Sequence, residues 1–143
     1  MNSYIMSTTH KNKTFATLLA VLLGGLGAHR FYLRGSVDKL GLIHLATLPM
    51  AGLAIGLAPQ AHWFFQLLPL LLSYIVGFVE ALVIGLTADE KFDAAFNTAS
   101  GKQSASKWYL VLLLVATMLM GTTALIATMA RLVDLLYTGG AHG

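Results

Sequence analysis

The sequence predicts an all-α fold: a polytopic membrane helix bundle with four transmembrane helices and a short interfacial helix. The 143 residues are 57% hydrophobic and only 10% charged, whereas a soluble domain is about 45–50% apolar and about 25% charged. The apolar residues form four long runs separated by short polar turns. The basic residues lie at the ends of these runs, as is typical of membrane proteins, and not in the patch that a nucleic-acid-binding surface needs.

The first predicted span covers residues 14–32 and follows a polar leader, residues 1–13. Its apolar part, residues 14–28, is shorter than the roughly 20 residues that cross the hydrocarbon core. Phe31 and Tyr32 extend it to the depth of the lipid headgroups, where aromatic rings are enriched. A basic leader before a short apolar run is also typical of a secretory signal peptide. We favour a retained span, because Arg30 and Arg34 follow the run directly and oppose translocation of that end.

The rest of the chain divides at changes in composition. The remaining predicted spans are residues 40–58, 63–86 and 108–130. The predicted parts are a polar leader (1–13), a membrane domain (14–97), a linker rich in Ser, Ala, Gly and Lys (98–107), an additional transmembrane helix (108–130) and a tail (131–143).

A short interfacial helix is predicted over residues 88–97, after the third span. Thr87 and Glu90 have the spacing of a capping box, in which the first residue caps the helix. Phe92 and Phe96 then lie one turn apart on one face. We expect these two rings to dip into the membrane interface.

Small residues at four-residue spacing predict where the third span packs against another helix, because close backbone approach drives association in lipid. This predicted seam consists of Ser73, Gly77, Ala81 and Gly85. A shorter match in the second span, Gly52 and Gly56, we interpret as a chance occurrence.

Glu80 lies on nearly the same helical face as this seam. We expect it to face the bundle interior, because a carboxyl group in lipid costs several kcal/mol. It is either a proton or ion site or a hydrogen-bonding anchor, and we favour the anchor because the sequence shows no chain of acids or amides. The candidate partners are His29, Arg30 and His44, among which the sequence does not choose.

The sequence predicts no catalytic residues, no cofactor and no metal site. The absence of cysteine excludes disulfides and thiolate metal ligands. His29 and His44 do not have the spacing of a helical ligand pair. Gly24-Gly25-Leu26-Gly27 ends an apolar run and does not open a helix after a strand, so a nucleotide-binding loop is excluded.

Lys11-Asn12-Lys13-Thr14, the apolar run and Gly24-Gly25-Leu26-Gly27-Ala28-His29-Arg30-Phe31-Tyr32-Leu33 together resemble the signature of the TM-two domain family. The motif residues are Gly24, Gly27, His29, Arg30, Phe31, Tyr32 and, as an intramembrane acid, Glu80. The resemblance extends over about residues 11–97, in a longer, bacterial-type form with additional spans. It implies a two-span membrane hairpin, no established enzymatic activity and a role in interaction or signalling.

We therefore expect a non-enzymatic membrane module that packs against a membrane protein partner or itself, in a bacterial inner (plasma) membrane. The alternative is a small transporter or ion-conducting oligomer that uses Glu80. The cluster of Arg30, Arg34 and Lys39 is expected to contact anionic lipid headgroups.

Four spans place six basic residues on one side of the membrane and three on the other. The positive-inside rule then puts the first and third turns in the cytoplasm and both termini outside. The six are Arg30, Arg34, Lys39, Lys91, Lys102 and Lys107; the three are Lys11, Lys13 and Arg131.

Overall fold

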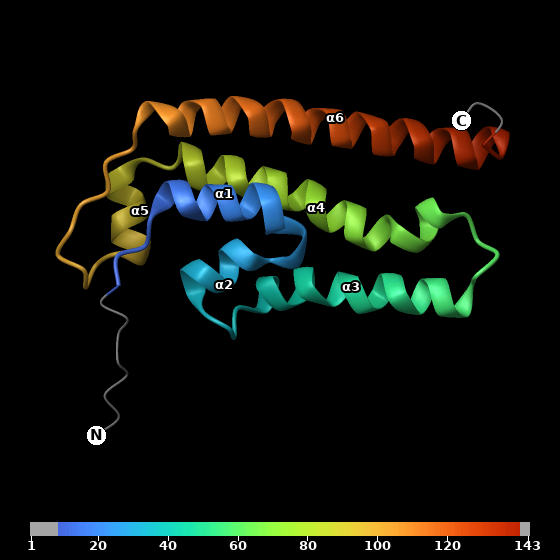
Figure 1. The fold of residues 1–143 in the computed structure, drawn as a ribbon, viewed down its shortest axis with the longest axis horizontal. Helices are drawn as coiled ribbons and strands as arrows, with labels where there is room; N and C mark the ends of the chain where they lie inside the picture. Colours follow the sequence, from blue (N-terminus) through green and yellow to red (C-terminus); the bar gives the residue numbers. More distant parts are fainter. Residues whose placement is uncertain (1–8, 141–143) are drawn as a thin grey trace, which may run out of the picture.

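The computed structural model describes residues 9–140, and its secondary structure consists of helices, with no strand in this part of the chain. The predicted all-α class is confirmed. Residues 1–8 of the predicted leader and 141–143 of the predicted tail lie outside the described residues. The elements are α1 (Lys13–Leu23), the 3-10 helix η1 (Gly24–Leu26), α2 (Ala28–Arg34), α3 (Lys39–Leu57), α4 (Trp63–Leu86), α5 (Asp89–Phe96) and α6 (Trp108–Thr138) (Figure 1).

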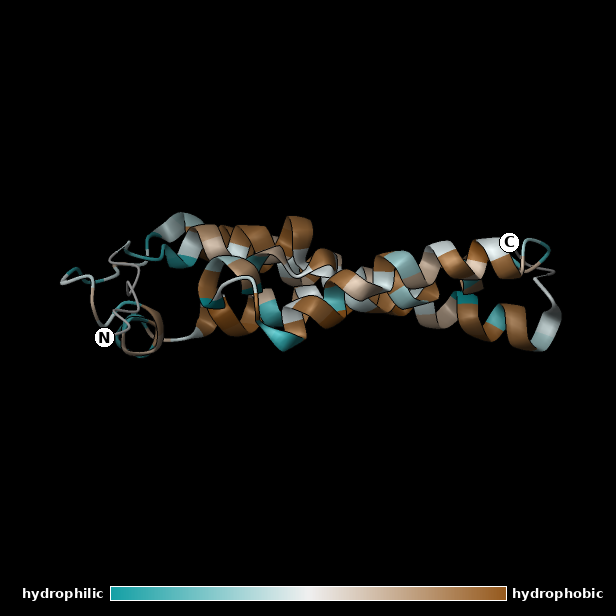
Figure 2. Cartoon of the chain, turned by 90° about the horizontal axis from the view of Figure 1, so that it is seen from below, coloured by the Kyte–Doolittle hydropathy of each residue, from teal (hydrophilic) through white to brown (hydrophobic). Residues whose placement is uncertain are grey.

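Three helices within the described residues, α3, α4 and α6, are long and apolar enough to cross a membrane. Their ribbons are mainly hydrophobic along their length, whereas hydrophilic residues gather most densely in the segments near α5 (Figure 2). Large apolar side chains point outward along all three, with Leu53, Val79 and Leu119 each more than half exposed. The chain is an integral membrane protein, because such a surface is stable only in lipid.

The first predicted span is not one helix, which corrects the expected count of four full spans. α1 has 11 residues, about 16 Å at 1.5 Å per residue and so about half the hydrocarbon thickness. The chain then turns through η1, and α2 runs back toward the end at which α1 began (Figure 1). Gly27 permits the reversal, because its φ of 73° is in the left-handed region that other residues rarely adopt. We call α1, η1 and α2 the hairpin.

α4 is the central element, and it contacts α1, η1, α3 and α6. Small residues allow this close packing. Ala20 and Val21 of α1 bury themselves against Ala81 of α4, and Phe78 and Leu113 pack around them.

α1 begins and α6 ends at opposite ends of the bundle (Figure 1). Four full spans would place them at the same end, so the expected arrangement of the two termini is corrected by the hairpin. The side chain of Asn97 holds the segment before α1 against the end of α5: Lys11 N donates to Asn97 Oδ1 at 2.6 Å, and Asn97 Nδ2 donates to Lys11 O at 3.0 Å. We call the end that carries residues 9–13, 34–39 and 87–107 the polar end.

α5 confirms the predicted short helix but not its capping box. Its N-cap is Ala88, and Thr87 Oγ1 instead donates to Val83 O of the preceding helix at 2.6 Å. The aromatic rings also differ from expectation, because Phe92 is only 1% exposed and packs against Phe96, with the ring centroids 5.1 Å apart. The ring of Phe92 therefore stabilises the protein interior and does not enter the lipid interface.

α6 is longer than the predicted span 108–130 and continues to Thr138, so the described part of the predicted tail is mostly helical. No glycine or proline interrupts residues 122–138. The helix ends at Gly139, whose φ is 66°, as is common for a helix C-terminus. An ion pair of 2.7 Å between Arg131 and Asp134 supports the last turns.

Candidate functional site

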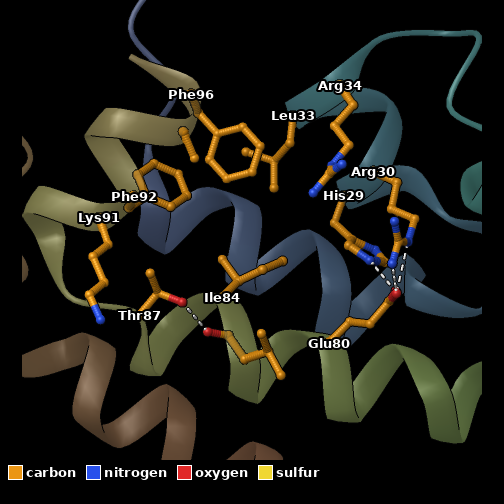
Figure 3. Close-up of a pocket in the computed structure, with 12 residues that line it drawn as sticks. His29, Arg30, Leu33, Arg34, Glu80, Ile84, Thr87, Lys91, Phe92 and Phe96 are labelled. Carbon is orange, nitrogen blue, oxygen red and sulfur yellow. Dashed lines mark hydrogen bonds and ion pairs between the residues drawn. The ribbon is translucent and has the colours of Figure 1, made fainter. Parts of the chain in front are cut away.

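The carboxylate of Glu80 on α4 is the centre of a polar network inside the bundle (Figure 3). Arg30 Nε donates to Glu80 Oε1 at 2.8 Å, and Arg30 Nη2 donates to the same oxygen. His29 Nε2 lies 2.6 Å from Glu80 Oε2, and His44 Nε2 lies 3.2 Å from that oxygen. The Glu80 side chain is 16% exposed. The structure thus brings all three candidate partners of Glu80 to one carboxylate and turns it inward.

The network also reaches the start of α3 and the seam of α4. Arg30 Nη1 lies 3.6 Å from Asp38 Oδ1, and the same Asp38 oxygen caps α3 by accepting from Gly41 N at 2.7 Å. On the other side, His44 Nδ1 lies 2.7 Å from Ser73 Oγ. The sequence did not assign Asp38 or Ser73 to this network. An aspartate in a turn commonly caps the next helix, and a small residue such as Ser73 commonly allows two helices to pack closely.

Ser73 satisfies a backbone group that the hairpin frees. Its Oγ donates to Gly25 O at 2.7 Å. Within a membrane, irregular backbone is stable only where it is buried in protein and its polar groups are bonded. Gly24, Gly25 and Gly27 are buried, so α4 supplies both the cover and the missing donor for the turn of the hairpin.

All four residues of the predicted seam are buried, and they face different neighbours. Gly77 lies against Gly24: a Cβ atom added to Gly77 would lie 2.8 Å from Gly24 Cα. Ala81 packs with α1. A Cβ atom added to Gly85 would lie 2.4 Å from Leu114 Cδ2 of α6. The seam therefore serves the hairpin and α6 within one chain.

Phe31 and Tyr32 contact protein, although the sequence predicted rings at headgroup depth. A Cβ atom added to Gly41 would lie 2.8 Å from the Phe31 ring, so Phe31 occupies the space that this glycine leaves on α3. Tyr32 Oη accepts from Asn12 N at 2.9 Å, and Lys11 Nζ lies 4.9 Å from the centre of the Tyr32 ring. The two aromatic residues fasten α2 to α3 and to the N-terminal segment.

A second polar cluster, which the sequence did not predict, joins Lys13, Asp89 and Ser106 at the polar end. Lys13 is buried and forms an ion pair of 2.5 Å with Asp89, and its Nζ donates to Thr87 O at 2.8 Å. Ser106 N donates to Asp89 Oδ2 at 2.7 Å. The hydrogen bonds from Lys13 and then Ser106 lower the pKa of Asp89 to about 2. No spacing signal joins a lysine of the leader to an acid more than seventy residues later.

Asp93 forms a similar connection between α5 and the linker. Ser104 N donates to Asp93 Oδ2 at 2.6 Å, and Asn97 Nδ2 donates to Asp93 Oδ1 at 2.7 Å. These bonds, from Asn97 first, lower the pKa of Asp93 below its usual range. The predicted linker is thus held to α5 by hydrogen bonds near its middle.

Among residues 9–140, no group of three or more His, Cys, Asp and Glu side chains has an arrangement that holds a metal ion. In the network, the Nε2 atoms of His29 and His44 instead point at Glu80 Oε2, and Arg30 contacts the other carboxylate oxygen. Through charge-assisted hydrogen bonds, the network around Glu80 binds the hairpin, α3 and α4 to one another.

The family model of the TM2 domain matches residues 9–58. The predicted resemblance is confirmed over this segment, which contains the hairpin and α3 together with His29, Arg30 and His44. Ser73 and Glu80 on α4 lie beyond the match. No curated protein and no solved structure matches the chain.

Proposed function

On the premise that residues 9–58 form a TM2 domain, we propose that this protein is a non-enzymatic membrane module that assembles with a membrane protein partner or with a second copy of itself. The observation that supports the proposal is the full engagement of the Glu80 carboxylate. Both of its oxygens have partners, from α2 and from α3. Four nitrogen contacts converge on the two oxygens, which is the arrangement expected of a structural anchor.

The anchor holds a hairpin that would not be stable alone in the membrane. α1 and α2 are each too short to span the hydrocarbon core, and their turn has unbonded backbone groups unless α4 covers it. Glu80 and Ser73 therefore make one rigid unit of the TM2 segment and α4. The outer face of α3 is left for another helix.

The face of α3 that carries Gly52 and Gly56 supports assembly. An added Cβ atom at either glycine would meet no atom of residues 9–140 within 4 Å, so another helix has room to approach the α3 backbone. Close approach between small residues is the usual basis of helix association in lipid. Gly77 and Gly85 face Gly24 and Leu114 of the same chain, whereas Gly52 and Gly56 face no described residue.

Disulfide crosslinking tests assembly directly, because the chain contains no cysteine. Gly56→Cys should form disulfide-linked dimers in native membranes under mild oxidation, or a mixed disulfide with a partner that carries a cysteine at the contact. Leu119→Cys, on the exposed face of α6, is the matched control. Pull-down of the uncrosslinked protein from the same membranes identifies what is bound. A chain that stays monomeric and is recovered without any protein partner would overturn the proposal.

We further propose that the polar end faces the cytoplasm of a cell whose plasma membrane holds the protein. Because of the hairpin, Lys11 and Lys13 lie at this end together with the other basic residues. The excess of Lys and Arg at one end is therefore larger than four spans would give, and the positive-inside rule places that end in the cytoplasm. Arg30 is in the network and Arg131 is near the opposite end. The basic residues at the polar end are Lys11, Lys13, Arg34, Lys39, Lys91, Lys102 and Lys107.

Reporters inserted after Gly101 and fused after Gly143 test this orientation. The first should be cytoplasmic and the second external. The N-terminus is then cytoplasmic, in contrast to the expectation from four spans. A cytoplasmic signal after Gly143 would contradict three crossings in this orientation.

A transporter or ion-conducting oligomer is the second candidate. It is favoured by the position of Glu80 beside a cavity and by His29 Nδ1, a buried nitrogen without a hydrogen-bond partner among the described residues. This function predicts that Glu80→Gln abolishes ion or proton flux into proteoliposomes while assembly persists. The anchor predicts unchanged flux and a less stable protein.

A further inference from the structure

A cavity of ≈ 450 Å³ lies between α2, α4 and α5 at the polar end (Figure 3). Its walls are mostly apolar, and the largest apolar side chains that form them are Leu33, Val83, Ile84, Phe92 and Phe96. Arg30, Arg34, Lys91 and Glu80 also line it. The cavity therefore combines an apolar interior with three cations and one acid.

The charges of the cavity do not balance. Glu80 is neutralised by Arg30 within the network. Neither Arg34 nor Lys91 takes part in an ion pair with the described residues, and the guanidinium carbon of Arg34 lies 5.7 Å from the centre of the Phe96 ring. Arg34 and Lys91 flank the rings of Phe92 and Phe96 on two sides (Figure 3). The cavity thus has one unpaired cation on each side of these rings.

The apolar wall continues onto the lipid-facing surface of the protein. Val83 lines the cavity and is also 62% exposed on α4, one of the membrane-spanning helices. Arg34 ends α2 and Lys91 lies in α5, so both are at the polar end, where we expect the headgroups of the bilayer. A ligand with an anionic head and an apolar chain fits both parts of this site.

We propose that the cavity binds an anionic phospholipid. Arg34 and Lys91 attract the anionic headgroup from the two sides of the cavity, and part of one acyl chain lies against Val83, Ile84 and Phe96. A free phosphate would use the cations but leaves the apolar walls without a role. The site differs from the surface cluster of Arg30, Arg34 and Lys39 expected from the sequence. Arg30 is paired with Glu80, and Lys91 of α5 supplies the second unpaired cation.

Native mass spectrometry of the full chain in detergent tests the proposal with phosphatidylglycerol and phosphatidylcholine. One phosphatidylglycerol should remain bound per chain, and phosphatidylcholine should not. Arg34→Gln and Lys91→Gln should each weaken binding about fivefold, the effect of one basic residue near a membrane surface. Lys39→Gln is the matched control, because it removes a charge from the same end without lining the cavity. Equal losses in all three variants would overturn the site.

Two further arms separate a lipid from a soluble anion. Ala95→Trp fills the cavity from α5 without changing its charge and should lower phosphatidylglycerol binding. Inorganic phosphate at millimolar concentration should not displace the lipid. An unaffected Ala95→Trp variant, or displacement by phosphate, would show that an anion is bound without its chain. This readout does not depend on assembly, so the lipid site and the proposed function can fail separately.

Discussion

Gly24 of η1 and Gly77 of α4 lie backbone against backbone. A Cβ atom added to either residue would come within 2.8 Å of the other's main chain. No side chain stands between the turn of the hairpin and the central helix, which is why Ser73, one turn earlier on α4, reaches Gly25 O. The position of the hairpin, and with it His29 and Arg30 against Glu80, depends on this contact.

Gly77→Ala should destabilise the protein by about 1–3 kcal/mol, as overpacking usually does. Backbone faces the new methyl group, and backbone cannot rotate away. The free energy of unfolding in mixed micelles, titrated with denaturant, measures the effect. Gly52→Ala is the control, because its methyl group enters open space. Similar stability of the two variants would mean that the contact is not tight.

Ser73→Ala should cost about 0.6–1.7 kcal/mol, the range for hydrogen bonds between helices in membranes. The change removes the bond to Gly25 O and the contact with His44 Nδ1. Thr117→Val also removes a buried hydroxyl, but this hydroxyl bonds to Leu113 O within its own helix. The same denaturant titration should show little change for Thr117→Val, and an equal loss in both would remove the hairpin-specific role of Ser73.

Arg30→Lys should destabilise the protein by about 1.5–3 kcal/mol, although the charge is kept. The guanidinium contacts Glu80 through two nitrogens and approaches Asp38 with the third, and an ammonium group cannot reproduce that fork. Lost hydrogen bonds to charged groups cost this much. Arg34→Lys serves as the control, since no carboxylate pairs with Arg34 within residues 9–140. A harmless Arg30→Lys would show that charge alone holds the hairpin.

Acid should weaken the polar end through Asp89. Its pKa is about 2 in the folded protein, below the usual 3.8, so the unfolded chain binds the proton more readily. The resulting stabilisation is fully present above about pH 4 and is lost as the pH falls from there through about pH 2. Asp89→Asn should flatten the pH dependence of the free energy of unfolding in this range.

The partners of Glu80 could be predicted from the sequence, but their geometry could not. A buried acid in an apolar run needs partners, and the chain offers few, so His29, Arg30 and His44 could be named in advance. Their distances, and the link through Asp38 and Ser73, depend on how three helices cross. The ion pair of Lys13 with Asp89 had no precursor in the sequence, because nothing local distinguishes it from a solvated lysine.

The sequence by itself determined the all-α membrane class, the three long spans and the inward position of Glu80, because apolar length and the cost of a charge in lipid are local properties. Only the tertiary structure decided that residues 14–32 are a hairpin. Glycines are ordinary in membrane helices, and Gly24-Gly25-Leu26-Gly27 allows both a continuous helix and a turn. The turn is stable because α4 presents Gly77 to admit it and Ser73 to bond its free carbonyl. That reversal also places the two ends of the described chain at opposite ends of the bundle.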